Sequence, residues 1–521
     1  MLTFIPSWEN ISYGGLSNDD LMGQIQAYQE SGEPYQIIIR DYIPSLRYFL
    51  HHYNLLESNY KSVFDYLQGS QNFEQRQVTL EELKFPKEAD FHFTPFCINV
   101  EIGNERIGQI YFGEGNQIKE VRYMKSNQYD YIDYYDDRGF VSQYQKFENE
   151  QVVAEVYLDI KEEWIFYIDS KSKKCQVNPQ NKKGLESLEY QTINELKWAC
   201  VELVVDSEST QPLLISVDEQ NISWIEQSPL KDRMILSFFK ERYPYSKENI
   251  NKLVDLNTKV HSFIVDTEAT FEKIESHFEE TPKVHLLSPY DTRFSLSKSQ
   301  EYSSEVIFID LRKISSNQTQ FLIESLIPYC ANVFIEKDRK VQLIFRTNNL
   351  TEQQRVSQKL NLYLEEKYKD SLLEIELFDA INEQGENKIE NALYGEMSEE
   401  AVWLKEFQED LEVLVLDNDD EFFKIMNITR LIIDLAPIPD LFTQIAGLSS
   451  GVPQIIKEET RYVEHKKNGW ILNSSQNFQE ALVYYLDSLK HWQEARVFSV
   501  QQIKEHSGIQ LQRKLSRIVG E

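Results

Sequence analysis

The stretch from 431 to 470, LIIDLAPIPDLFTQIAGLSSGVPQIIKEETRYVEHKKNGW, constrains the fold of this chain more than any other. Its apolar run Leu431–Asp434 predicts a strand, and two prolines then break any helix before residue 440. Apolar residues recur at helical spacing over Leu441–Leu448, and Gly451 predicts the helix end. Val452–Ile456 predicts the next strand. This order makes one βαβ unit, which is normally right-handed and belongs to a parallel sheet.

Apolar runs alternate with helical segments through the whole C-terminal part of the chain. Six runs predict strands, at Val306–Asp310, Val341–Phe345, Leu372–Leu377, Val413–Leu416, Leu431–Asp434 and Val452–Ile456. Four segments predict helices, at about 317–330, 351–368, 441–449 and 477–490. We therefore expect a doubly wound, Rossmann-type domain over 291–490, after a polar hinge. Residues 491–521 predict one terminal amphipathic helix.

The N-terminal part shows the same alternation in two pieces, 1–77 and 206–290, which we expect to form one Rossmann-like domain. A strand at 2–5 is followed by Gly14 and Gly15 and then by a helix. A helix N-terminus after a glycine turn suits a phosphate group. A plain tight turn also uses glycine, because glycine readily adopts a positive φ. The glycine pair alone therefore does not separate a phosphate site from an ordinary turn.

The segment 78–205 has a different character. Short aromatic and β-branched runs are separated by turn residues, which predicts an antiparallel β-meander inserted into the first domain. Its tyrosines, as in Tyr129–Tyr135, are compatible with a stacking platform for sugar or peptide, or with ordinary packing surface. The fold class is therefore α/β, with two Rossmann-type domains and an antiparallel insertion.

Composition excludes several classes of function. The net charge of −31 argues against nucleic acid as a general partner, because phosphate binding depends on a positive field. The four cysteines, Cys97, Cys175, Cys200 and Cys330, are too far apart for a disulfide framework or a zinc pattern, so we expect no metal. The opening MLTFIPSWEN has no basic region of a signal peptide, and no run approaches the ~20 apolar residues of a membrane helix. We expect a cytoplasmic protein.

The segment Ser449–Pro453 resembles part of a motif in retaining GT-B glycosyltransferases. In those enzymes a glutamate, seven residues and a second glutamate precede small residues and Gly-Val-Pro. The two glutamate positions fall here on Ile438 and Ala446. In an active enzyme such carboxylates lie near the donor sugar, and losing one aimed group of this kind typically costs ~10²–10³ in rate. The resemblance therefore implies a GT-B-like fold without catalytic residues.

A second departure concerns the donor diphosphate. Active relatives hold it with an arginine after a glycine and with a lysine five residues later, and these positions fall on Arg312 and Asn317, with Leu311 at the glycine. One cation of the two remains, and it suits either a phosphate contact or a surface ion pair. We expect no cofactor. The candidates for a vestigial cleft are Gly14, Gly15, Arg312, Asn317 and Gly451.

Nearly the whole chain resembles the family of the first accessory Sec system protein. The resemblance is most specific at Phe4–Trp8, the Asp136–Phe140 hairpin and 445–470. This resemblance implies a non-enzymatic GT-B member whose terminal helix crosses back to the first domain. It also implies a cytosolic complex with a hydrolase-like and a carbohydrate-binding-module-like subunit. That complex delivers a glycosylated serine-rich-repeat adhesin to a motor ATPase and channel, peripherally at the membrane.

Three further interpretations remain open at this level. The chain is alternatively an active retaining glycosyltransferase that modifies the adhesin and uses Asp434 or Asp440, which lie where ligands dock in such folds. A second alternative is glycan recognition by the tyrosine-rich sheet. Basic residues at 461–467, 504–517 and 171–183 also suit an acidic membrane surface, although a solvated face is their usual meaning.

Overall fold

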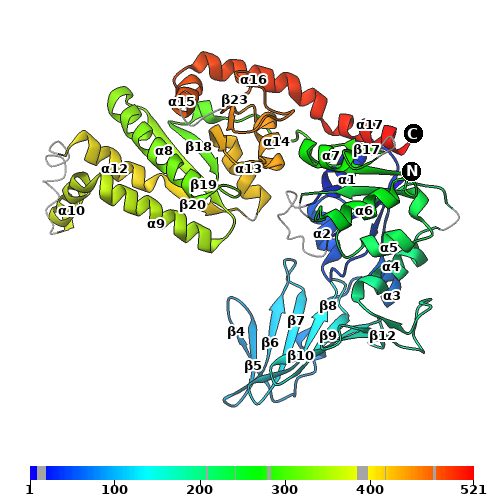
Figure 1. Cartoon of the computed structure of the whole chain (residues 1–521). Coiled ribbons are helices and arrows are strands. Elements are labelled where there is room, and N and C mark those ends of the chain that lie inside the picture. The colour runs from blue at the N-terminus through cyan, green and yellow to red at the C-terminus, as the bar shows by residue number, and fades with distance from the viewer. Residues whose placement is uncertain are drawn as a thin grey trace. The chain divides into compact units, whose positions relative to one another are not determined.

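The computed structural model describes residues 1–8, 19–206, 209–240, 242–278, 283–383, 397–416, 418–472 and 477–520. They form two compact units (Figure 1). The described residues up to Pro289, together with those from Gln512 onward, make the first unit, and Tyr290–Leu511 makes the second. Gly14 and Gly15 lie outside the described residues, so the predicted glycine turn has no structural account.

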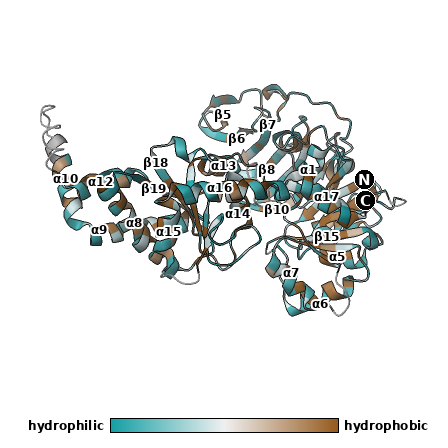
Figure 2. Cartoon of the chain, turned by 90° about the horizontal axis from the view of Figure 1, so that it is seen from above, coloured by the Kyte–Doolittle hydropathy of each residue, from teal (hydrophilic) through white to brown (hydrophobic). Residues whose placement is uncertain are grey.

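A seven-stranded parallel sheet forms the centre of the first unit, in the order β17-β16-β15-β14-β1-β2-β3. Its strands are β1 (Leu2–Ile5), β2 (Tyr35–Ile39), β3 (Tyr60–Ser62), β14 (Leu213–Ser216), β15 (Met234–Phe238), β16 (Ser262–Val265) and β17 (Val284–Leu286). Its helices are α1 (Leu21–Ser31), α2 (Leu46–His52), α3 (Val63–Gln68), α4 (Ile193–Val204), α5 (Ile222–Gln227), α6 (Lys247–Leu256) and α7 (Glu268–Glu275). Every residue of β1, β14, β15 and β16 is buried, as expected for parallel strands covered on both faces, and the strands around β15 are largely hydrophobic in Figure 2.

The insertion between α3 and α4 is a ten-stranded sheet in which sequence neighbours pair antiparallel. Its strands are β4 (Asp90–Phe93), β5 (Ile98–Ile102), β6 (Glu105–Phe112), β7 (Ile118–Lys125), β8 (Gln128–Tyr135), β9 (Val141–Glu148), β10 (Gln151–Leu158), β11 (Trp164–Asp169), β12 (Cys175–Val177) and β13 (Glu189–Tyr190). Tyr123 and Tyr135 are buried in its core, and Tyr123 stacks on Tyr131 with ring centroids 4.4 Å apart. These tyrosines therefore serve packing.

The hairpin between β8 and β9 joins this sheet to the parallel sheet. Its Arg138 donates to Asp65 of α3 at 2.7 Å and to Asp136 at 2.7 Å. Arg47 of α2 donates to the same two carboxylates and, through Nε, to Asp137 at 2.7 Å. All five charged side chains are buried or nearly so, so each is compensated by its neighbours. The hairpin singled out in the sequence is thus a structural joint.

A six-stranded parallel sheet forms the centre of the second unit, in the order β20-β19-β18-β21-β22-β23. Its strands are β18 (Ser304–Asp310), β19 (Lys340–Thr347), β20 (Leu411–Val415), β21 (Thr429–Asp434), β22 (Gln454–Ile456) and β23 (Gly469–Ile471). Its helices are α8 (Ser316–Lys337), α9 (Leu350–Lys367), α10 (Lys369–Glu383), α12 (Glu399–Glu409), α13 (Asp419–Ile428), α14 (Leu441–Ser450), α15 (Phe478–Leu486) and α16 (Leu489–Ile503). The βαβ unit predicted from the sequence is β21, α14 and β22, and Gly451 ends α14 with φ of 68°.

Two sequence expectations are corrected here. The predicted strand Leu372–Leu377 lies inside α10. Ile375 and Phe378 are buried while Leu373 and Leu377 are 48% and 65% exposed, which is the spacing of a helix, because a short apolar run does not by itself separate helix from strand. The single helix predicted over 491–521 is two helices, α16 and α17 (Gly508–Val519), with a 3-10 turn and an extended Ser507 between them.

Candidate functional site

The candidate site lies at the topological switch point of the second sheet, where the order in which strands are added reverses. The chain leaves β18 first toward β19 and later returns to its other side as β21, so the carboxyl ends of β18 and β21 flank the switch point at which such folds bind ligands. Each strand ends there in an aspartate. Asp310 and Asp434 are register partners, and both are buried. Two buried carboxylates therefore lie side by side at the switch point.

Arg312 pairs with the first of these carboxylates, Asp310, and with Asp440 at the start of α14. Its Nε donates to Asp310 at 3.0 Å and one terminal nitrogen lies 2.6 Å from the same carboxylate. That nitrogen also lies 3.0 Å from Asp440. Burial works against the charge, yet the carboxylates of Asp440 and Asp310 raise the pKa of Arg312 above its ordinary value. Two anions thus neutralise the one cation that the sequence placed near a donor diphosphate.

Asp434 and Asp440 accept hydrogen bonds from the backbone of the loop between β21 and α14 and of the first turn of α14. Asp434 accepts from the N–H groups of Ala436 at 3.0 Å and Asp440 at 2.8 Å, one on each oxygen. Burial, together with the nearby charge of Asp310, raises the pKa of Asp434 to about 7. Asp440 caps α14 by accepting from the N–H and the hydroxyl of Thr443, each at 3.0 Å. Both acids proposed for an active enzyme therefore have structural partners.

The other residues predicted from the donor motif are scattered. Ile438 is 52% exposed on the loop before α14, whereas Ala446 is fully buried within that helix. Gly451 is the helix C-cap, and Asn317 is exposed in the first turn of α8. Only Arg312 of these described residues reaches the acids of the switch point. Thr443 and Arg346 complete the cluster, 3.3 Å and 3.7 Å from Asp310, and no spacing in the sequence pointed to either.

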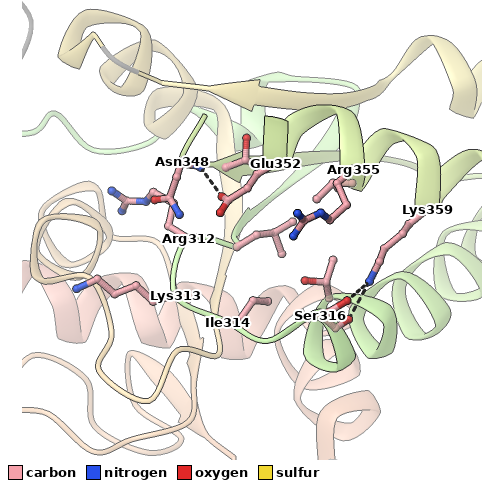
Figure 3. A pocket seen from close by; sticks show the side chains of 12 residues that line it. Arg312, Lys313, Ile314, Ser316, Asn348, Glu352, Arg355 and Lys359 are labelled. Atoms are coloured by element: carbon pink, nitrogen blue, oxygen red, sulfur yellow. Dashed lines mark hydrogen bonds between the residues drawn. The ribbon is translucent and has the colours of Figure 1, made fainter. Parts of the chain in front are cut away.

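A cavity of about 270 Å³ lies beside the cluster, between the loops that follow β18 and β19 (Figure 3). Arg312, Lys313, Arg355 and Lys359 are its basic lining residues, and Glu352 is its acidic one. Lys359 donates to the carbonyl and hydroxyl oxygens of Ser316 at 3.0 Å and 2.6 Å, as Figure 3 shows. Of these residues the sequence analysis singled out Arg312 alone. The helical spacing of Arg355 and Lys359 on α9 was a further signal for this surface, and sequence reasoning missed it.

This cavity has the chemistry of an anion site. The starts of α8 and α9 add their partial positive charge to the basic side chains. Its carboxylate Glu352 already accepts from the N–H of Asn348 at 3.1 Å. Among the described residues, no group of three or more His, Cys, Asp or Glu side chains is arranged to hold a metal ion. Nor does any described helix have the length and hydrophobicity needed to cross a membrane.

The family model of the first accessory Sec system protein, also called accessory secretory protein 1, matches residues 1–521. This chain belongs to that family. A relative in Streptococcus gordonii, which carries the same accessory Sec system name, is 29% identical over 98% of this chain and 97% of its own length. The predicted family is confirmed, and this member of the accessory Sec family has a role in accessory secretion.

Solved structures agree with this placement. One is a crystal structure of accessory secretory protein 1, 2 and 3 in Streptococcus pneumoniae, in which the matching chain is 26% identical, with a TM-score of 0.76 over 100% of this chain and 99% of that one. The pneumococcal O-GlcNAc transferase GtfA, solved with UDP and GlcNAc, has a TM-score of 0.66 over 100% of this chain and 98% of its own. Its 12% identity shows the fold alone. The predicted GT-B-like fold class is confirmed.

Proposed function

We propose that this accessory Sec family member is a non-enzymatic adaptor and chaperone of the export machinery. The observation that carries the proposal is the double pairing of Arg312 with Asp310 and Asp440. A donor diphosphate would have to displace two buried or nearly buried carboxylates from this arginine, and each would then lose its closest compensating charge. Ile438 and Ala446 offer no carboxylate at the positions where active relatives have glutamates.

The proposed partners are further accessory secretion proteins, one hydrolase-like and one resembling a carbohydrate-binding module. Support comes from the relative that was solved together with accessory secretory proteins 2 and 3. The cargo is a glycosylated serine-rich-repeat adhesin, which the complex passes to the accessory motor ATPase and channel from the cytoplasm, at the membrane periphery. A standard interface takes ~800 Å² from each partner, and a body of two Rossmann-type units with a ten-stranded sheet has surface for several.

Turnover and co-purification test this proposal together. The purified chain is incubated with UDP-sugars and an unglycosylated serine-rich peptide, and separately co-expressed with the two partner proteins. We expect no sugar transfer and a stable complex. Transfer above the level of an Arg312→Ala, Asp434→Asn double variant would contradict the non-enzymatic part. Failure to co-purify would contradict the adaptor part.

The alternative of an active glycosyltransferase has one observation in its favour. The carboxyl of Asp434, with a pKa raised to about 7, has the affinity for protons that suits a general acid or base. Its two oxygens are nevertheless both engaged with backbone N–H groups. If the alternative holds, Asp434→Asn and Asp440→Asn each abolish transfer that the unmodified chain performs.

A further inference from the structure

A second and larger cavity, of about 640 Å³, lies in the first unit, away from the site described above. It is lined by α4 and α5, by the turn before α5, and by Tyr190 at the end of the inserted sheet. Its volume falls within the ~300–1,000 Å³ of small-molecule sites. The adaptor function proposed above does not involve this cavity.

Two tryptophans form one wall of this cavity. The rings of Trp198 and Trp224 stack with centroids 4.0 Å apart and an interplanar angle of 12°. Trp198 is 1% exposed, and the guanidinium of Arg40 lies 4.8 Å from its ring centroid. Trp224 is partly exposed, and its Nε1 donates to Glu202 at 3.0 Å. The stack and the hydrogen bond hold Trp224 in one orientation, so a ligand that packs on it does not have to order the ring.

Apart from Tyr190 and Ala199, the rest of the lining is polar, and it carries no positive charge. Asn194, Gln220 and Gln227 present amides, which both donate and accept hydrogen bonds. Asn194 already donates to Gln220, so these two side chains hold one another in place. Among the described residues that line the cavity, none is lysine or arginine. A phosphate or carboxylate ligand would find no counter-charge here.

The two glutamates of the lining already accept from neutral donors. Glu202 accepts from Trp224 and from the hydroxyl of Ser228 at 3.2 Å. Glu195 accepts from the N–H of Gln191 at 2.7 Å. These hydrogen bonds help to position the side chains of the cavity wall. They also occupy carboxylate oxygens that a cationic ligand would otherwise pair with. An aromatic wall with amides around it suits a ligand that has an apolar face and a rim of hydroxyl groups.

We propose that this cavity binds a neutral saccharide, with a sugar ring against Trp224 and its hydroxyl groups bonded to the amides of Gln227 and Gln220. Hydroxyl groups donate and accept at once, as the amides do. One sugar ring held by a single tryptophan and two amides has few contacts, so we expect a Kd of about 1 mM.

Ligand-observed NMR and calorimetry on the full chain test this inference. The probes are glucose, N-acetylglucosamine and the disaccharides of each, with a short lysine-rich peptide as the competing class. We expect saturation transfer to at least one saccharide, and a Kd raised about tenfold or more by Trp224→Ala, which is the change that loss of ~1.4 kcal/mol produces. Trp164→Ala is the control, because Trp164 is 38% exposed on β11 and does not line the cavity.

The exposed Gln227→Ala keeps the test valid if Trp224→Ala disturbs folding, because Gln227 makes no contribution to the tryptophan stack. We expect it to weaken saccharide binding while the thermal unfolding midpoint stays unchanged. Three results would overturn the inference: no saccharide of the panel binds, both variants bind as tightly as the unmodified chain, or the peptide alone binds. The adaptor proposal is judged separately, by complex formation.

Discussion

The guanidinium of Arg312 lies 3.0 Å from the Oδ2 atom of Asp440. The same carboxylate caps α14, so one side chain both starts the helix of the βαβ unit and neutralises the cation of the switch point. In a nucleotide-binding crevice, a cation at this place would face the ligand. Here its charge is compensated by two carboxylates of the protein, and the geometry is that of a structural cluster.

Replacing Asp440 with alanine should therefore destabilise the chain by more than the loss of a cap. A lost N-cap costs about 1 kcal/mol, and removing one partner of a largely buried pair adds to that cost. The control is Asn418→Ala, which removes the cap of α13 and, because asparagine carries no charge, breaks no ion pair. Thermal unfolding of both variants measures the difference. Equal shifts of the midpoint would mean that the Arg312 pair contributes nothing.

The two degenerate motif positions should respond very differently to glutamate. Ala446→Glu places a carboxylate at a fully buried position, and an uncompensated buried charge is strongly unfavourable, so we expect a loss of several kcal/mol or insoluble protein. Ile438→Glu affects a residue that is 52% exposed and should leave the unfolding midpoint nearly unchanged. Soluble yield and midpoint are the measurements. A stable Ala446→Glu variant that transfers sugar would argue against the adaptor proposal.

Asp434 should make stability depend on pH. Its pKa is raised from an ordinary value near 3.8 to about 7, so the folded chain binds more protons than the unfolded chain between these values. The stabilising effect is complete below about pH 4 and is lost as pH rises through 7. We expect the stability of the unmodified chain relative to Asp434→Asn to fall over this interval. Denaturant unfolding at several pH values checks it, and parallel profiles would be the contrary result.

Arg138 should be essential to the joint of the inserted sheet. Arg138→Ala leaves Asp65 and Asp136 with less compensation, and breaking a buried pair in this way costs about 3–5 kcal/mol. Lys174→Ala is the control, because Lys174 and Glu189 form an ion pair whose side chains are 39% and 43% exposed, so water already screens it. Hydrogen exchange of the hairpin 136–140 should rise in the first variant alone. Unchanged exchange there would assign the joint to other contacts.

Gly139 offers a sharper test of the same joint. Its φ is +87°, and a Cβ at this position would lie 2.3 Å from the carbonyl oxygen of Arg76. Gly139→Ala should therefore shift the hairpin and lower the unfolding midpoint. Gly32→Ala is the comparison, with positive φ but open space around the added methyl group. If both substitutions cost the same, backbone strain alone explains the effect, and close packing at the joint does not.

Local patterns predicted the elements that are governed by neighbours in the chain. The βαβ unit at 431–456, with its end at Gly451, follows from apolar spacing and from the left-handed conformation that glycine adopts readily. The same reasoning was wrong at Leu372–Leu377, because six residues of alternating character fit a strand as well as one side of α10. What decided between them was the packing of Ile375 and Phe378.

The sequence by itself determined the order of α and β elements and the antiparallel insertion. It also determined that neither Ile438 nor Ala446 carries a carboxylate at the two motif positions. Those properties depend on residue type and on spacing along the chain. Only the tertiary structure decided that Arg312 is neutralised twice, because Asp310 is two residues away in the chain whereas Asp440, at the start of α14, lies far along it. Charge compensation depends on distance in space, and the return of the chain beside β18 creates that proximity.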